Sequence, residues 1–174
     1  MHRTRVFIAV IGAAGLLGGC ATYEPSIPPG YTGPTAELHD WIEMEASTKA
    51  SIFYVASIDG RPIWNSKDAT SAASNGQGFR LVPKDVQRKV PAHPMKLEIV
   101  GRTYHAAPIQ AMVATEYQVK GAIDFVPEEG KTYVVQGKLG EQYSGVWVVE
   151  AHSDSVVGQK IEVNGSAALG FFEK

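Results

Sequence analysis

Apolar and polar residues alternate along much of the chain after residue 35, which is the pattern of β-strands with one face in a core. Runs with this pattern, or with a continuous apolar stretch, are predicted as strands at 50–58, 95–100, 119–126, 132–139 and 146–150. In the first run, the alternation places Ile52, Tyr54 and Ile58 on one face and Phe53 and Val55 on the other.

The rest of the chain predicts shorter strands and connectors. Weaker strand patterns lie at 36–40, 78–82, 102–105 and 156–163. The third of these continues the strand 95–100 past an expected bulge at Gly101. Small polar residues and prolines predict a loop with at most one helical turn at 66–78, and connectors at 84–94 and 108–112.

A hairpin is predicted where strands 119–126 and 132–139 flank a five-residue turn that contains a glycine. No segment shows a convincing amphipathic helix period. Short strands with turns every eight to twelve residues favour an all-β fold, a single β-sandwich of about 7–8 mostly antiparallel strands, over a barrel.

The N-terminal residues have the pattern of a secretory signal. Arg3 and Arg5 precede an apolar run at 6–17, and small residues follow it. A helix of that length rises about 18 Å, which is too short for a bilayer core of about 30 Å. Cys20 is the one cysteine of the chain and comes directly after Leu17, Gly18 and Gly19.

The sequence 17–20 resembles the bacterial lipobox. The resemblance implies that the Cys20 thiol receives a diacylglycerol, that the chain is cleaved before Cys20 and that the new amine is acylated. Several acyl chains would anchor the protein stably. The alternative is an ordinary signal peptide followed by a chance cysteine. Because Ala21 stands where inner-membrane retention commonly uses aspartate, the resemblance implies the outer membrane of a Gram-negative bacterium, with the domain facing the periplasm. Display on the cell surface is a second possibility.

Three regions are therefore expected: a signal peptide at 1–19, a lipidated cysteine and flexible tether at 20–34, and a sandwich domain at 35–174. The tether contains four prolines and two glycines, so it is predicted to be an extended spacer, with a docking strip for a partner as the alternative. The mature domain has no cysteine and needs no disulfide to fold.

The charge of the chain bears on its partners. Cleavage removes two of 16 basic residues and none of 18 acidic ones, so the mature charge is 14 − 18 = −4. Nucleic-acid binding is disfavoured, since it normally needs a basic face. The predicted partners are the membrane, through the acyl chains on Cys20, and an envelope protein.

A group of small bacterial lipoproteins with a transthyretin-like or immunoglobulin-like sandwich is similar to the chain from residue 33 onward. The resemblance rests on the segments 58–60, 125–133 and 146–150. It implies a β-sandwich and carries over no catalytic residue.

Motifs for catalysis and metal binding are not matched. The segment 130–132 ends like a phosphate-binding loop, but Phe125 stands where the loop needs glycine. His152, Ser153 and Asp154 are of triad types, yet adjacent residues cannot converge. The histidines of the mature chain have no metal-ligand spacing. No catalytic, cofactor-binding or metal-binding residue is therefore predicted.

The richest polar region lies between residues 88 and 112. We predict a recognition surface from five residues there: Arg88, His93, Arg102, Tyr104 and His105. The alternative is a structural connector with an exposed edge.

Two functions are compatible with the sequence. The first is a non-enzymatic envelope lipoprotein with a binding or assembly role in the periplasm. The second is a ligand-binding or cell-wall-acting module for a glycan or small molecule, whose site forms only in the fold.

Overall fold

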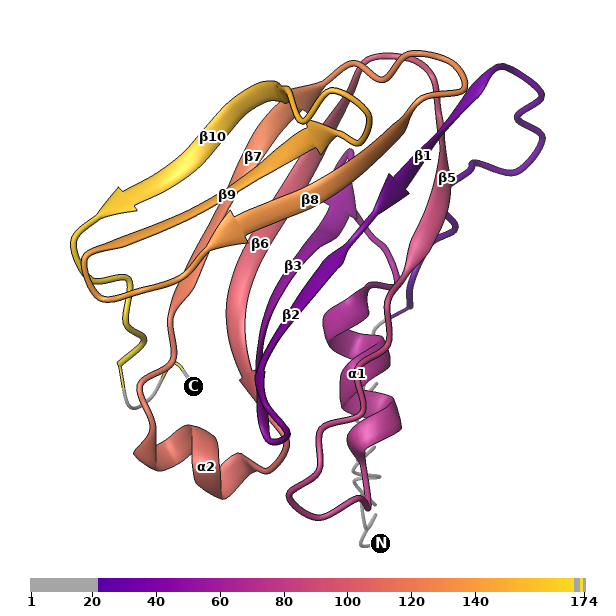
Figure 1. The fold of residues 1–174 in the computed structure, drawn as a ribbon. Helices are drawn as coiled ribbons and strands as arrows, with labels where there is room; N and C mark the ends of the chain where they lie inside the picture. The colour runs from indigo at the N-terminus through magenta and orange to yellow at the C-terminus, as the bar shows by residue number, and fades with distance from the viewer. Residues whose placement is uncertain (1–21, 171–172, 174) are drawn as a thin grey trace, which may run out of the picture.

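Two five-stranded sheets face each other in the computed structural model, which describes residues 22–170 and 173 (Figure 1). The predicted all-β sandwich is therefore confirmed, with ten strands instead of the expected seven or eight. The signal region 1–19, Cys20 and Phe171–Phe172 lie outside the described residues.

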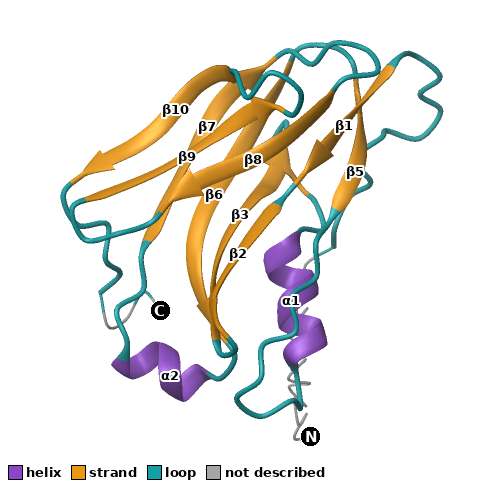
Figure 2. Cartoon of the chain, viewed as in Figure 1, coloured by secondary structure: helices purple, strands orange, loops and turns teal. Residues whose placement is uncertain are grey.

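One sheet contains, in spatial order, β10 (Val156–Asn164), β9 (Tyr143–Glu150), β8 (Thr132–Lys138), β1 (Thr35–His39) and β5 (Gln87–Pro91). The other contains β2 (Trp41–Ala46), β3 (Lys49–Ile58), β6 (Met95–His105) and β7 (Gln118–Phe125), with β4 (Arg61–Pro62) paired to β3. The β1–β8 pair is parallel and the other pairs are antiparallel. Two helices, α1 (Ser66–Ser74) and α2 (Pro108–Val113), lie outside the sheets (Figure 2).

The core between the sheets is tightest around the buried ring of Phe53. A methyl group on Gly101 of β6 would lie 2.9 Å from a ring carbon, and one on Gly137 of β8 would lie 2.5 Å away. Because Gly137 belongs to the opposite sheet, the two sheets approach closely at this point. Glycine at both positions is a packing requirement of the core.

The strands β7 and β8 do not pair, so the predicted hairpin at 119–139 is wrong. The strand β7 pairs with β6 in one sheet, whereas β8 pairs with β9 and β1 in the other. The link between them crosses from sheet to sheet, and the rings of Phe125 and Tyr133 meet edge to face at 5.0 Å. A hairpin within one sheet and a link between two sheets bury the same alternating side chains. The alternation in the sequence therefore does not distinguish the two arrangements.

The chain also crosses between sheets at Asp40, between β1 and β2. The buried Asp40 carboxylate accepts two hydrogen bonds from the Arg88 guanidinium, at 2.8 and 2.7 Å. It also accepts from the backbone N–H of Val55 at 3.1 Å and of Ser66 at 2.8 Å. Asp40 therefore binds β5, β3 and the start of α1 at the point where the chain crosses between the sheets. We call this set of contacts the Asp40 corner.

Both faces of β3 are buried, one between the sheets and one beneath a second cluster on the outside. Ile52 and Tyr54 belong to the outer cluster, as the alternation predicts. A register shift between Val55 and Ser57 turns Ile58 into the inter-sheet core. The predicted shared face of Ile58 with Ile52 and Tyr54 is therefore wrong.

Several predicted connectors form regular structure. The segment 66–78 contains α1, 84–94 contains β5 and 108–112 lies within α2, while 78–82 forms no strand. Gly76 and Gly78, with φ of 78° and 64°, turn the chain there, and Leu81 packs into the outer cluster. The register of β6 continues through Gly101 without a bulge.

The segment 22–34 lies against the domain, in contrast to the predicted flexible tether. The backbone N–H of Glu24 donates to the Pro62 carbonyl at 2.8 Å, and the Ser26 hydroxyl donates to the Lys89 carbonyl at 2.8 Å. The Tyr23 ring packs edge to face on Trp64 at 5.0 Å. The segment turns at residues 28–31, where the backbone N–H of Tyr31 donates to the Pro28 carbonyl at 3.1 Å.

We expect the substitution Asp40→Ala to lower the free energy of unfolding by about 3–5 kcal/mol, because it leaves the buried Arg88 guanidinium without its partner. Equilibrium denaturation by urea measures this loss. Lys131→Ala breaks the exposed Lys131–Glu128 pair instead and is expected to leave the urea midpoint nearly unchanged. Equal midpoints for the two variants would contradict the role of the Asp40 corner.

We expect the substitution Gly137→Ala to lower the free energy of unfolding by about 1–3 kcal/mol. The added methyl group would collide with the Phe53 ring and with the carbonyl oxygen of Gly145. The matched control is Gly140→Ala, where the nearest atom would be a carbonyl oxygen at 3.4 Å. Thermal unfolding compares the stabilities of the two variants. A Gly137→Ala variant as stable as the Gly140→Ala variant would contradict the close approach of the two sheets at Gly137.

Candidate functional site

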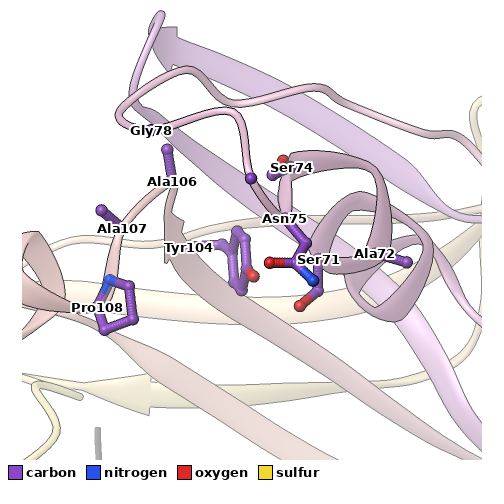
Figure 3. A pocket seen from close by; sticks show the side chains of 10 residues that line it. Ser71, Ala72, Ser74, Asn75, Gly78, Tyr104, Ala106, Ala107 and Pro108 are labelled. Atoms are coloured by element: carbon purple, nitrogen blue, oxygen red, sulfur yellow. The ribbon is translucent and has the colours of Figure 1, made fainter.

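A groove lies between α1 and the corner where β6 leads into α2, and we call it the α1–α2 groove. It consists of two adjoining hollows of about 480 and about 280 Å³ that share Tyr104, Ala106 and Pro108. Figure 3 shows Tyr104 between the two walls of the larger hollow. One wall is α1 and the loop after it, lined by Lys67, Ser71, Ala72, Ser74, Asn75, Gly76 and Gly78.

Helix α1 begins at Asn65, whose side-chain oxygen accepts the backbone N–H of Asp68 at 3.1 Å. Its buried face is a stripe of hydroxyls spaced four residues apart: Ser66, Thr70 and Ser74. These hydroxyls accept the backbone N–H groups of Val86, Lys84 and Val82, at 2.7, 3.0 and 2.9 Å respectively. The helix therefore packs on an extended backbone, and this contact leaves its small outer residues free to line the groove.

The smaller hollow has a polar end formed by Glu116. Its carboxylate, which is 4% exposed, accepts from the Arg102 guanidinium at 3.2 Å and lies 3.2 Å from Nδ1 of His105. Arg102 also donates to the Gln118 side chain at 3.2 Å. Arg102 is one quarter exposed, so it presents positive charge to the groove while Glu116 holds it in place.

Three of the five predicted recognition residues, namely Arg102, Tyr104 and His105, meet at this groove. Arg88 does not, because it is buried against Asp40. His93 lies on a different loop, where its ring packs on Tyr31 at a centroid distance of 6.0 Å. The recognition surface stays a prediction for the three residues that the fold brings together.

Sequence reasoning missed the α1 wall and Glu116. The spacing of Ser66, Thr70 and Ser74 is the one signal that indicates a helix there, because it places three hydroxyls on one face. Glu116 gave no such signal, since it follows α2 outside any strand period.

The segment 152–154, which contains residue types of a catalytic triad, lies in a surface turn. Ser153 donates to the Glu150 carboxylate at 2.5 Å, and His152 is largely exposed beside it. Within residues 22–170 and 173, no group of three or more histidine, cysteine, aspartate or glutamate side chains is placed to hold a metal ion. The same residues contain no helix with the length and apolar character needed to cross a bilayer.

Comparison with protein-family models, with curated proteins and with solved structures finds no match to this chain. The groove must therefore be interpreted from its own residues.

Burial raises the pKa of Tyr54, which lies in the outer cluster with Tyr104, to about 12. Between pH 10 and 12 the unfolded chain loses this proton while the folded chain keeps it. The free energy of unfolding should therefore fall as pH rises through this range, by at most about 1.4 kcal/mol per unit.

Urea denaturation at pH 9 and 11.5 tests this dependence, and Tyr54→Phe is expected to reduce the loss of stability. A hydrogen bond to Glu162 also raises the pKa of Tyr143 to about 12, but that side chain lies in an exposed contact. Tyr143→Phe should therefore change the pH dependence less. The same loss in the parent and in Tyr54→Phe would contradict the assignment.

Proposed function

We propose that this protein is a lipid-anchored envelope lipoprotein that binds a partner protein through the α1–α2 groove and has no enzymatic activity of its own. The proposed location is the outer membrane of a Gram-negative bacterium, facing the periplasm. The lipobox-like segment 17–20 and the resemblance to small bacterial lipoproteins support the anchor and the location. Both remain predictions from the sequence.

The observation that carries the binding role is the form of the groove. Its α1 wall consists largely of small side chains and glycine backbone, and its polar groups Arg102, Glu116 and His105 already satisfy one another. A catalytic or small-ligand site usually has polar groups that converge on an empty position. An open groove with small walls leaves room for an extended segment of another protein, whose own backbone N–H and C=O groups would make the polar contacts.

A second candidate is the binding of a glycan or other small molecule. It is favoured by the half-buried ring of Tyr104, which two hollows of suitable volume share. Aromatic rings commonly support apolar faces of ligands.

Site-specific photocrosslinking in cells separates these candidates. A photoreactive residue at Ala72, an exposed position of the α1 wall, is expected to give one discrete protein adduct. The same residue at Glu129, in the link between β7 and β8 at the other end of the molecule, should not give that adduct (Figure 1).

Two further variants sharpen the test. Cys20→Ser should abolish the adduct by removing the anchor, and Ser71→Trp should reduce it by filling the groove beside the probe. Identical adducts at positions 72 and 129 would contradict a groove-directed partner. No adduct at position 72 would favour the small-molecule candidate, which binding assays with soluble glycans would then examine.

A further inference from the structure

Large apolar side chains are exposed along α2 and in the loop after α1. Within α2, Ile109 is 57% exposed, Met112 51% and Val113 83%, and no residue of the helix is buried. Phe79, in the loop, is 60% exposed. We call these four residues the apolar rim. Large apolar side chains that are exposed close together commonly mark a contact with a membrane or a partner.

The two parts of the apolar rim lie on opposite sides of the α1–α2 groove. Gly78 and Pro108, the neighbours of Phe79 and Ile109, line the same hollow. Figure 1 shows α2 and the loop after α1 at one end of the molecule, and Figure 3 shows Gly78 and Pro108 among the residues that line the larger hollow. The two parts of the rim therefore lie beside the groove at that end.

The two segments that carry the apolar rim contain no acidic residue. The segment 69–84 contains Arg80 and Lys84 and no acidic residue, and the segment 106–115 contains no charged residue. The mature chain as a whole has a charge of 14 − 18 = −4. Asp85, which follows Lys84, lines another hollow with His39 and Gln87. The charge of these two segments complements an anionic lipid surface, whereas Glu116, which lines the smaller hollow, is paired with Arg102.

The segment that follows the proposed anchor contacts the first turn of α1. Tyr23 donates a hydrogen bond to Asp68 in the first turn of α1, at 2.8 Å. Cys20 lies three residues before Tyr23, a separation of at most about 11 Å. Helix α1 has nine residues and is therefore about 13 Å long. The acyl chains would thus be attached within about 11 Å of Tyr23, whose side chain contacts the first turn of α1, and the loop with Phe79 follows the other end of this helix. Tyr23 and Trp64, which are 36% and 44% exposed, are aromatic residues of the kind found at lipid interfaces.

We infer that the apolar rim inserts into the surface of the lipid bilayer that holds Cys20, so that the α1–α2 groove opens at the membrane. This inference rests on the proposed lipid anchor. A lipid surface fits better than a second copy of the chain, because the proposed anchor would hold the rim beside lipid, and because the segments 69–84 and 106–115 contain no acidic residue to pair with Arg80 and Lys84 of another copy.

Fluorescence quenching by lipids tests the inference on the full mature protein, purified from membranes and reconstituted into vesicles of phosphatidylethanolamine and phosphatidylglycerol. Met112→Cys places a thiol-linked fluorophore on the rim. The control Glu129→Cys places it in the exposed link between β7 and β8. We expect brominated lipids to quench the fluorophore at position 112 several-fold more than the one at position 129.

The parent protein distinguishes failure of the inference from failure of the anchor. Cys20 is its one cysteine, so an acylated parent takes up no thiol label. Labelling of the parent would overturn the anchor, and the inference with it. An unlabelled parent with equal quenching at positions 112 and 129 would overturn the inference alone. So would a fluorophore at position 112 that is shielded from water but not quenched by lipid, because that result would show a protein covering the rim.

Discussion

The buried ion pair between Asp40 and Arg88 is the contact on which the arrangement of this protein depends. Asp40 sits where the chain leaves one sheet for the other, and its carboxylate is bound by β5, β3 and the first residue of α1. An unpaired buried carboxylate is costly, so these partners must assemble together. The nitrogen Nε of Arg88 is buried without a hydrogen-bond partner, which is a further cost that the corner sustains. The position of α1, and with it one wall of the groove, follows from this corner.

Helix α1 also shows how polar residues can form a packing surface. Its hydroxyl stripe binds the backbone of residues 82–86, which in turn leads directly into β5 and Arg88. The segment 22–34 closes the same side of the molecule through Tyr23, Trp64 and Asp68. The segment that follows the proposed anchor, the helix and the groove are therefore joined by continuous contacts, so that the proposed attachment at Cys20 would orient the groove as well as retain the protein. The apolar rim is proposed as a second contact with the membrane, in addition to the acyl chains on Cys20.

The sequence predicted the fold class because the strands with the strongest alternation, such as 50–58 and 119–126, are also the buried ones. The prediction failed where the buried side chains are polar, and where the tertiary fold determines how the strands pair. The hydroxyl face of α1 has the composition of a loop, and Arg88 at a core position hides the period of β5. The link from β7 to β8 could join two strands of one sheet or of two, since both choices bury Phe125 and Tyr133. Of the residues that line the groove, Arg102, Tyr104 and His105 were among the predicted recognition residues because they lie close together in the sequence. The residues of the α1 wall were not predicted, because only the tertiary fold brings them close to Arg102, Tyr104 and His105.

The most direct test of the functional account is the intact mass of the protein purified from membranes of a Gram-negative host, with fragmentation of its N-terminal peptide. The account predicts a chain that begins at Cys20 and carries a diacylglycerol on the thiol and a fatty acid on the amine. A chain that begins at another residue, or one in which Cys20 has a free thiol, would contradict the anchor and the orientation of the groove that depends on it.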